Sequence, residues 1–397
     1  MKYPLLYDAF SNQDILEGIK ILKSKQITMS NKTREFEKKF ANYLNTKYAL
    51  MVNSGSSANL LAVALICNPL RKNNLKPGDE VIIPVLCWST SLWPLVQYGL
   101  KPKFVDIELE NLNIDIKKLE ESITKKTKAI FCVHVLGLSS NMVKIKNLAK
   151  KNNLLIIEDT CESFGSKFRN KFLGTYGEAG TYSFYYSHQI TSGEGGMIVC
   201  NHKEDYEILL SLRAHGWARD EILLKKYKKY KNLDPRFLFV NSGYNLRPTE
   251  IQAAIGLNQF KRKQIFKKER ELNRQKIIKK VTQNSKYDNQ ISFIYANDNI
   301  DPSWFGLPII INSKFKYNKK KYLNFLEKKG IETRPIISGN FANQPATKLY
   351  NLNEKNLKFP NAQYIEDHGF FIGLHTKKID NKALDYISSN LLKINEI

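Results

Sequence analysis

The chain has 397 residues and an ordinary globular composition, with 42% hydrophobic and 25% charged residues, and its formal net charge is +24. This length exceeds what one small core can organise and predicts two domains. The charge does not by itself indicate nucleic-acid binding, because the basic residues are spread along the chain without a zinc-finger or RNA-binding motif. We expect no nucleic-acid partner and a basic surface that attracts a diphosphate-containing substrate.

The cysteines and the apolar runs indicate a cytoplasmic protein. Five cysteines lie far apart and none forms a Cys-x-x-Cys pair, so the sequence predicts neither a metal site nor a disulfide framework. An odd number of free thiols is typical of a reducing compartment. The N-terminal residues lack the apolar core of a signal peptide, and no apolar run approaches the roughly 18 residues that cross a membrane. We therefore expect no membrane partner.

The first two thirds of the chain alternate strand-like and helix-like segments. Four short apolar runs predict buried parallel strands. These runs are VIIPV (81–85), KFVDI (103–107), AIFCVHV (129–135) and LLIIED (154–159). Residues 141–151, between the last two runs, have the apolar spacing of a helix. This alternation predicts an α/β fold with a mostly parallel sheet covered on both faces, whose ligands bind at the carboxyl ends of the strands.

A change in character marks a second, smaller domain. The segment 248–262 predicts a helix with Pro248 near its start, and a long charged helix follows over 264–281. Beyond it lie WFGLPIII (304–311), a Lys-rich amphipathic segment (316–328) and IETRPII (331–337). We predict a large α/β domain over 1–264 and a small C-terminal α+β domain over 265–397.

Two motifs of the large domain carry polar groups suited to binding. Asn-Ser-Gly-Ser-Ser (53–57) precedes an apolar helical run and places free backbone N–H groups at a helix start, where anions bind. A buried strand ends in Glu158 and Asp159, and an ionised carboxylate there can hold a protonated ring nitrogen of a cofactor. Taken singly, a serine N-cap and a loop cap explain the two motifs equally well.

Seven motifs in one order resemble the sugar aminotransferase family of fold-type-I pyridoxal 5′-phosphate (PLP) proteins, which builds amino sugars for antibiotics and surface polysaccharides. The motifs are VNSGSSANLLA, IPVLCWST, PKFVDI, IEDTCESFG, SFYYSHQITSGEGGMIV, RAHGW and GYNLRPTEIQAAIG. Together they are far more specific than any one of them. The resemblance implies a fold-type-I architecture and PLP, or its amine form pyridoxamine 5′-phosphate (PMP), as the cofactor.

The resemblance assigns residues to the ring of the cofactor. Asp159 would pair with the pyridinium nitrogen and keep it protonated, and Trp88 would stack on the ring face. Glu162 stands where the family usually has a glutamine that contacts the ring hydroxyl, so the carboxyl puts this contact in question.

The resemblance also assigns a phosphate site and a dimer. Ser56 and Ser57 would hold the phosphate through backbone N–H and hydroxyl groups, together with Ser183. Asn245 would reach the phosphate from the neighbouring subunit, which requires a homodimer with active sites at the interface.

His188 decides the predicted reaction, because aminotransferases of this family carry a lysine at its position. The lysine anchors the cofactor covalently and moves a proton, whereas an imidazole can do only the second. With an ordinary pKa of about 6.5, an imidazole takes and returns protons near neutral pH. We therefore expect a cofactor that is held without a covalent bond, and His188 as the catalytic acid/base.

The implied reaction is the 3-dehydration of a nucleotide sugar. L-Glutamate would form PMP, His188 would move a proton, and a nucleotide-linked 4-keto-6-deoxy sugar would lose its C3 hydroxyl. The products would be a 3,6-dideoxy-4-keto sugar, ammonia and 2-oxoglutarate. The stretches CWSTSLWPLVQYGLKP and LLSLRAHGWARD place the chain nearest to the branch of the family that acts on GDP-4-keto-6-deoxy-D-mannose in the colitose pathway.

A related branch of the family acts on a CDP-sugar and holds an iron–sulfur cluster through closely spaced cysteines in the later part of the chain. No cysteine follows Cys200 here, so we expect no iron–sulfur cluster and no partner reductase. The motifs do not distinguish GDP from CDP, or a hexose from a heptose.

Four further residues are candidates for the substrate. His215, Arg219, Arg247 and Arg334 would bind the sugar nucleotide or glutamate, since arginine suits bidentate contacts with anions. A surface arginine or a packed side chain explains each of them equally well. Two alternatives to the dehydratase stay open: a nucleotide-sugar 4-aminotransferase, if His188 is an engineered substitution of lysine, and a non-enzymatic sensor with a PLP fold.

Overall fold

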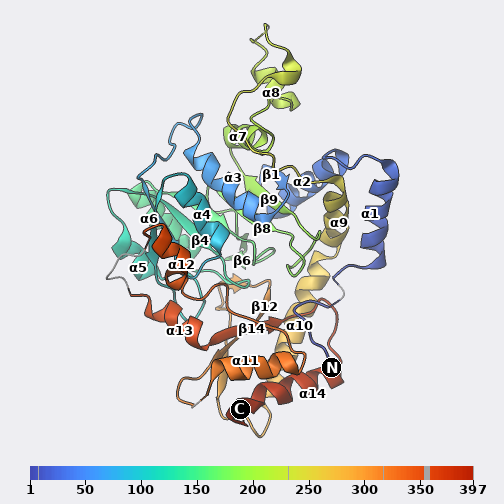
Figure 1. The fold of residues 1–397 in the computed structure, drawn as a ribbon, viewed down its shortest axis with the longest axis vertical. Helices are drawn as coiled ribbons and strands as arrows, with labels where there is room; N and C mark the ends of the chain where they lie inside the picture. Colours follow the sequence, from blue (N-terminus) through green and yellow to red (C-terminus); the bar gives the residue numbers. More distant parts are fainter. Residues whose placement is uncertain (8, 231, 316, 353–357, 397) are drawn as a thin grey trace.

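The computed structural model describes residues 1–7, 9–230, 232–315, 317–352 and 358–396. A large seven-stranded sheet lies between helices, and a smaller four-stranded sheet with its own helices lies below it (Figure 1). Both chain ends lie beside the smaller sheet (Figure 1). The predicted α/β fold with a large, mostly parallel sheet is confirmed.

The strands of the large sheet pair in an order that differs from their order in the chain. From one edge to the other they are β1 (Tyr48–Val52), β9 (Gly196–Cys200), β8 (Ala179–Ser183), β5 (Leu155–Asp159), β4 (Thr127–Val133), β2 (Glu80–Pro84) and β3 (Lys101–Val105). β9 is antiparallel to both of its neighbours, and the strands from β8 to β3 are parallel. The four predicted strands are confirmed as β2, β3, β4 and β5. Three of them are buried for most of their length, which explains their continuous apolar runs.

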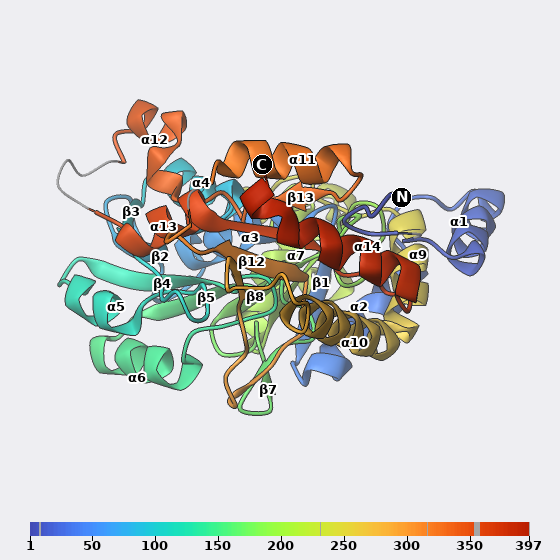
Figure 2. The ribbon, with the colours of Figure 1, turned by 90° about the horizontal axis from the view of Figure 1, so that it is seen from below.

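Helices cover both faces of the large sheet, with α3 and α4 on one face and α5 and α6 on the other (Figure 2). The helices of this part are α1 (Asn12–Ser24), α2 (Asn31–Leu44), α3 (Gly55–Cys67), α4 (Ser89–Gln97), α5 (Ile116–Ser122), α6 (Met142–Asn152), α7 (Lys203–Arg213), α8 (Glu221–Lys226) and α9 (Glu250–Lys261). The helix predicted over 141–151 is α6. It begins there because the Asn141 side chain accepts the Lys144 N–H and caps the helix.

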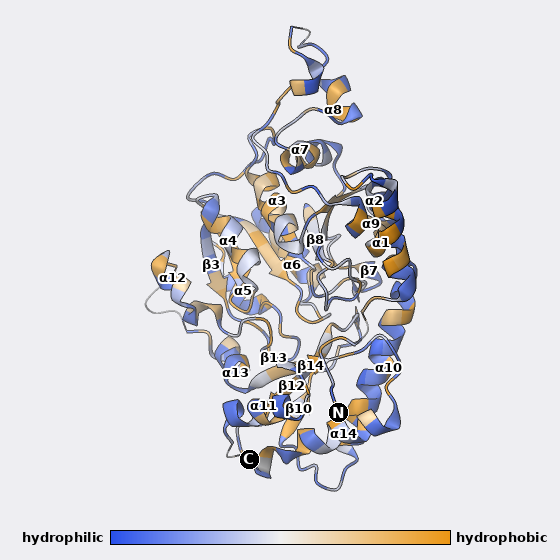
Figure 3. Ribbon diagram, turned by 45° about the vertical axis from the view of Figure 1, so that its right-hand side comes forward, coloured by the Kyte–Doolittle hydropathy of each residue, from blue (hydrophilic) through white to orange (hydrophobic). Residues whose placement is uncertain are grey.

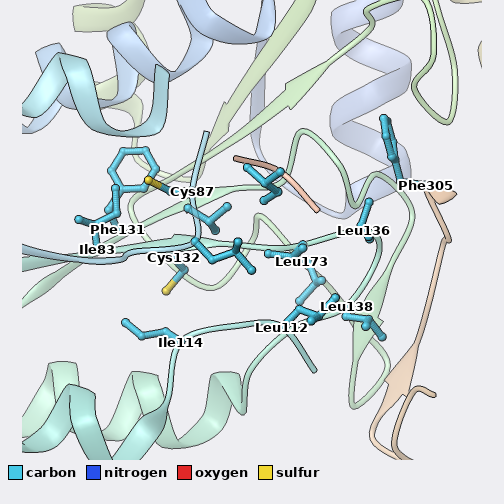
Figure 4. Packing of buried hydrophobic residues seen from close by; sticks show 14 of the residues in the cluster. Ile83, Cys87, Leu112, Ile114, Phe131, Cys132, Leu136, Leu138, Leu173 and Phe305 are labelled. Carbon is cyan, nitrogen blue, oxygen red and sulfur yellow. The ribbon is translucent and has the colours of Figure 1, made fainter. Parts of the chain in front are cut away.

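The two sheets share one apolar core. α3 is apolar around most of its circumference, as a helix covered on all sides must be (Figure 3). Figure 4 follows the core from Ile83 and Phe131 in the large sheet, past Leu136, to Phe305 at the start of the smaller sheet. This continuity fixes the smaller sheet against the carboxyl ends of the large sheet's strands.

Two helices connect the parts of the molecule. The helices predicted over 248–262 and 264–281 are α9 and α10 (Lys263–Thr282). Thr249, after Pro248, caps α9 in a reciprocal capping box with Gln252. α10 runs along one side of the molecule to the smaller sheet (Figure 1). The division into domains at residue 265, within the first turn of α10, stays a prediction.

The smaller sheet is antiparallel, in the order β10 (Ile291–Phe293), β12 (Gly306–Ile311), β14 (Gly369–Gly373) and β13 (Thr333–Arg334). Its helices are α11 (Lys319–Lys328), α12 (Pro345–Leu349), α13 (Pro360–His368) and α14 (Asn381–Leu391), with short 3-10 turns at Pro235–Phe237, Phe341–Asn343 and Leu392–Glu396 elsewhere in the chain. The three segments predicted for this part contain β12, α11 and β13; residue 316 lies outside the described residues. Tyr3 pairs with Ile331 beside β13, which draws the N-terminal segment alongside this sheet.

Two smaller features complete the fold. A three-stranded sheet consists of β11 (Ile300–Asp301), β6 (Lys167–Phe168) and β7 (Lys171–Phe172). The arm, which we define as residues 217–230 and 232–240, carries α8 and projects away from the rest of the chain (Figure 1).

Among the described residues, none of the helices combines the length and the apolar character that a bilayer crossing requires.

Candidate active site

A cavity of about 870 Å³ lies where the large sheet, the smaller sheet and the N-terminal segment meet. The last residues of β4, β5 and β8, which are Val133, Asp159 and Ser183, form part of its wall. Ligand binding at this edge of the sheet is what the alternation of strands and helices predicts. Seven of the twelve predicted site residues line the cavity: Ser56, Trp88, Asp159, Glu162, Ser183, His188 and Arg334.

The Asp159 carboxylate is held by three donors and is only 4% exposed. Its Oδ2 accepts Asn59 Nδ2 at 2.8 Å and Ser91 Oγ at 2.7 Å. Its Oδ1 accepts the Cys161 N–H at 3.1 Å. Thr181 orients Asn59 by donating to its Oδ1 at 2.6 Å. All three groups donate, so they suit a carboxylate that only accepts hydrogen bonds. Its Oδ1 can accept one further hydrogen bond, for example from the N–H of a cationic ring.

The neighbouring Glu158 does not line the cavity, because successive side chains of a strand point to opposite faces. It is fully buried and accepts three backbone N–H groups from the loop 174–177 at 2.5–3.0 Å. Of the two acids at the end of β5, Glu158 therefore organises this loop, and only Asp159 is available to a ligand.

The start of α3 offers donors to an anion. Ser54 caps the helix by accepting the Ser57 N–H at 3.1 Å. The N–H groups of Gly55 and Ser56 have no partner among the described residues, and both residues line the cavity. Ser183 lies so close that a Cβ added to Gly55 would be 2.5 Å from its Cβ. Two free N–H groups and the nearby hydroxyls fit a phosphate.

We expect Gly55→Ala to weaken the binding of PLP by about 10- to 100-fold, because the added methyl group must displace Ser183, which is predicted to bind the phosphate. A PLP titration followed by absorbance measures this affinity. Gly18→Ala is the matched control, since its added Cβ meets nothing closer than 3.5 Å. Equal affinities for the two variants would contradict the role given to Gly55.

His188 lies in the loop between β8 and β9 and is half-buried. Its Nδ1 is 2.6 Å from the carbonyl oxygen of Cys161, and because a carbonyl only accepts, Nδ1 carries the proton. Burial lowers the pKa of His188 to about 4; the bond to Cys161 opposes this shift, and the Arg270 charge adds to it. The imidazole is therefore neutral at neutral pH, with an unprotonated Nε2 that can act as a base.

Glu162 lies in the loop after β5, and its Oε2 accepts the Leu136 N–H at 3.0 Å. Burial raises the pKa of this carboxyl to about 7, and the charge of Asp159 acts in the same direction. The side chain therefore changes its protonation near neutral pH. In its protonated form it is a hydrogen-bond donor, as a glutamine amide is.

Glu162→Gln should change how stability depends on pH. The pKa of Glu162, about 7 in the folded chain, lies above its ordinary value of 4.5, so folding loses stability as the pH rises between these values. Glutamine does not titrate, so we expect the variant to gain stability over the natural chain at about pH 8 relative to about pH 5. Urea midpoints of the cofactor-free protein at the two pH values measure this gain. The same difference at both pH values, or the same gain in the exposed control Glu120→Gln, would refute the shift.

Five predicted residues do not line the cavity of their own chain. The Ser57 hydroxyl donates to Asn53 Oδ1 at 2.6 Å, so both of its polar groups are engaged locally. Arg219 places its guanidinium over the Trp217 ring, 4.9 Å from the ring centroid, at the base of the arm.

The other three residues form one group outside the cavity wall. Arg247 Nε donates to Asn245 Oδ1 at 3.0 Å, and its Nη2 lies 3.4 Å from His215 Nε2. Asn245 and His215 are exposed. Arg334, by contrast, is an exposed residue on the wall of the cavity, where it pairs with Glu332.

Sequence reasoning missed several wall residues. The N-terminal residues 4–7 line the cavity, held by the Leu5 N–H to Glu332 Oε2 (2.8 Å) and by His375 Nε2 against the Pro4 carbonyl (2.7 Å). No short-range pattern marks this long-range contact. Asn59 was detectable, because it is a polar residue facing into an otherwise apolar helix.

Metal ligands do not gather in the described part of the chain: no three His, Cys, Asp or Glu side chains there are placed to hold an ion. All five cysteines are free thiols.

The fold is that of the sugar aminotransferases, and the chain belongs to the DegT/DnrJ/EryC1/StrS aminotransferase family, whose model matches residues 9–391. It is 38% identical over 391 residues to GDP-4-keto-6-deoxy-D-mannose 3-dehydratase of Escherichia coli O55:H7 (strain CB9615 / EPEC), with 98% of each chain covered. The family and the fold-type-I architecture predicted from the motifs are confirmed.

Solved structures agree with this assignment. The structure of E. coli GDP-4-keto-6-deoxy-D-mannose-3-dehydratase with bound hydrated PLP has a TM-score of 0.88 and 36% identity, and the match covers 98% of this chain and 99% of that one. A structure of GDP-4-keto-6-deoxymannose-3-dehydratase with a trapped PLP-glutamate geminal diamine has a TM-score of 0.88 and 35% identity, covering 98% of this chain and 100% of that one.

Proposed function

We propose that this protein is a PLP/PMP-dependent 3-dehydratase that removes the C3 hydroxyl of a GDP-linked 4-keto-6-deoxy sugar, with L-glutamate as the amino donor. The products are a 3,6-dideoxy-4-keto sugar, ammonia and 2-oxoglutarate. The observation that carries the proposal is His188, with Nδ1 bonded to the Cys161 carbonyl, on the cavity wall where aminotransferases of the family have a lysine. The similarity to named 3-dehydratases over nearly the whole chain supports it.

The residues of the cavity fit PLP. Asp159 Oδ1 would face the ring nitrogen, and Trp88, which is 56% exposed at the cavity, would cover a face of the ring. Ser183 and the free N–H groups of Gly55 and Ser56 would bind the phosphate. When bound, the cofactor supplies a conjugated electron sink that permits loss of the sugar hydroxyl.

His188 would move protons through Nε2. The Cys161 carbonyl fixes the tautomer, so the base atom and its direction are set before the substrate arrives. An Nε2 that has taken a proton becomes a donor and can return it to the departing hydroxyl. The Phe305 ring, 4.9 Å from the imidazole between centroids, keeps water from this side of the base.

Arg334 would bind a carboxylate of glutamate or a phosphate of the nucleotide. Its guanidinium pairs with Glu332, which also accepts the Leu5 N–H, so the N-terminal segment helps to orient it. Arginine in this position offers a planar pair of donors to an anionic substrate.

The sites would be completed in a homodimer. His215 and Arg247, predicted for the substrate, lie together with Asn245, predicted for the cofactor phosphate, outside their own cavity, as residues that serve the partner's cavity would. The arm exposes large apolar side chains that a partner would cover. These are Tyr230, Leu233, Phe237 and Phe239.

A hybrid dimer tests this arrangement. We expect Asn245→Asp and His188→Asn to be inactive alone and to recover about a quarter of the natural activity after mixing and subunit exchange, because one of the two sites in each hybrid is then intact. Absence of recovery in a sample shown by native mass spectrometry to contain hybrids would contradict shared sites.

We also place the protein in the cytoplasm, because free thiols persist in a reducing compartment. Fractionation of cells of the natural source, with the protein detected by antibody, checks this placement.

The proposed reaction is tested with the purified protein, PLP, L-glutamate and GDP-4-keto-6-deoxymannose. We expect 2-oxoglutarate, ammonia and a sugar without its C3 hydroxyl, detected by mass spectrometry and proton NMR. Accumulation of a 4-amino sugar would instead establish an aminotransferase. The CDP-linked and heptose analogues, assayed in the same way, separate the nucleotide and sugar alternatives.

A further inference from the structure

Arg270 of α10 is a buried cation, and all its hydrogen-bond partners among the described residues are backbone carbonyls. It is 1% exposed, and no acidic side chain among the described residues bonds to it. Its Nη1 donates to the carbonyls of Trp304 at 3.1 Å and Phe305 at 2.8 Å. Its Nη2 donates to the carbonyls of Ser187 at 3.4 Å and His188 at 3.0 Å. An unpaired buried charge is unfavourable, so a residue of this kind is expected where it has a function.

The four carbonyls belong to two segments that meet at the cavity. One is the loop of His188, and the other leads into β12 and carries Phe305, whose ring packs edge-on against the imidazole. Gln189 links the same regions a second time, because its Nε2 donates to the carbonyls of Glu162 at 2.6 Å and Ser303 at 3.0 Å. The histidine loop is thus tied to the smaller sheet on both sides of the imidazole.

We propose that Arg270 is a positioning residue for His188. It fastens the histidine loop to the segment of Phe305, and its fixed positive charge beside that loop adds to the effect of burial in favouring the neutral imidazole with Nε2 free. The use of Nε2 as a base rests on the proposed function, whereas the neutral tautomer is a property of the chain itself.

Other groups around the imidazole act with or against this charge. The titratable and charged groups that contact it or share its cavity are Asp159 at the end of β5, Cys161 and Glu162 in the following loop, Tyr185 and Tyr186 in its own loop, and Tyr7, His134, Glu194, Glu332 and Arg334 on the cavity wall. The negative charge of Asp159 favours a protonated imidazole, and the positive charge of Arg270 opposes it. Without Arg270, burial alone opposes the Asp159 charge, and the pKa of His188 rises.

The same charge also affects a second histidine. Arg270 acts with burial to lower the pKa of His375, whose ring stacks on Tyr3 at 4.1 Å between centroids. The pKa of His375 therefore gives a second measure of the Arg270 charge in the same protein.

The test is histidine NMR of the full-length protein without substrate. Long-range ¹H–¹⁵N spectra give the tautomer and pKa of each histidine, and His188→Asn assigns the resonance. We expect Arg270→Gln to raise the pKa of His188 by about one unit, with part of the ring changing tautomer. Arg270→Lys, which keeps the charge but loses donors, should leave the pKa near its natural value. Lys268 is an exposed cation on the same helix, and Lys268→Gln should change neither the pKa nor the tautomer of His188.

A pH profile of kcat/KM extends the test to the reaction. We expect the acid limb of Arg270→Gln to move upward by the shift seen in the NMR titration, and that of Lys268→Gln to stay in place. An unchanged His188 titration in Arg270→Gln would overturn the proposal, as would an equal loss of kcat/KM at every pH.

If the glutamine variant does not fold, the same NMR titration is made on Arg270→Lys. The proposal then requires that the pKa and the tautomer of His188 equal those of the natural chain, and a changed value of either would overturn it. Because the titration needs no substrate, its failure is separate from a failure of the dehydratase assignment.

Discussion

His188→Gln is expected to lower kcat for dehydration by about 10²- to 10⁴-fold, the range that a positioned acid/base contributes. The glutamine amide can still bond to the Cys161 carbonyl, so the loop keeps its shape, but an amide does not take up a proton and cannot act as a base. Release of 2-oxoglutarate and loss of the C3 hydroxyl, followed separately, show which half of the reaction needs the imidazole. His202→Gln, an exposed histidine at the start of α7, is the control and should retain full activity.

His188→Lys separates the two functions of the family's lysine. A lysine at this position can bond covalently to PLP, so we expect a visible absorption band and a cofactor that remains attached to the chain after borohydride treatment. The natural chain, treated in the same way, should release its cofactor on denaturation. Covalent attachment of PLP in the natural chain, found by mass spectrometry, would refute the function proposed for His188.

Asp159→Asn is the second substitution with a large expected effect. Loss of a charged hydrogen bond worth about 1.5–3 kcal/mol should weaken PLP binding about 10- to 100-fold. The donors from Asn59, Ser91 and Cys161 all approach this carboxylate, and an amide nitrogen in its place would oppose one of them. We also expect kcat to fall, because an amide does not keep the ring nitrogen protonated.

A PLP titration and an assay at saturating PLP measure the two effects of Asp159→Asn separately. Asp298→Asn, an exposed aspartate in the smaller part of the chain, is the matched control. An Asp159→Asn variant with the PLP affinity and kcat of the natural chain would exclude Asp159 from contact with the cofactor.

Short-range patterns in the sequence were sufficient to predict elements whose burial depends on the residues of the element itself. The runs 81–85, 129–135 and 154–159 became buried strands because a strand covered on both faces favours apolar side chains at successive positions. The long helix α10 was predictable from its charge pattern and length. The edge strand β3, which starts exposed, was recognisable only from its apolar second half.

The candidate site divides in the same way. The family resemblance assigned Asp159, and not Glu158, to a ligand, and the structure supplies the reason, because Asp159 is on the side of β5 that meets the cavity. The N-terminal residues 4–7 and Phe305 reach the cavity only through contacts with residues more than a hundred positions away, such as His375 and His188. No periodicity encodes such contacts.

The sequence by itself determined the family, four strands of the large sheet and the presence of an imidazole in place of a lysine, because these depend on residue type and on short-range order. The tertiary structure alone decided the state of that imidazole. The Cys161 carbonyl selects the tautomer, and burial together with Arg270 keeps the ring neutral. The pKa of a side chain depends on what the fold packs around it, and for His188 those neighbours come from β5, α10 and the start of β12.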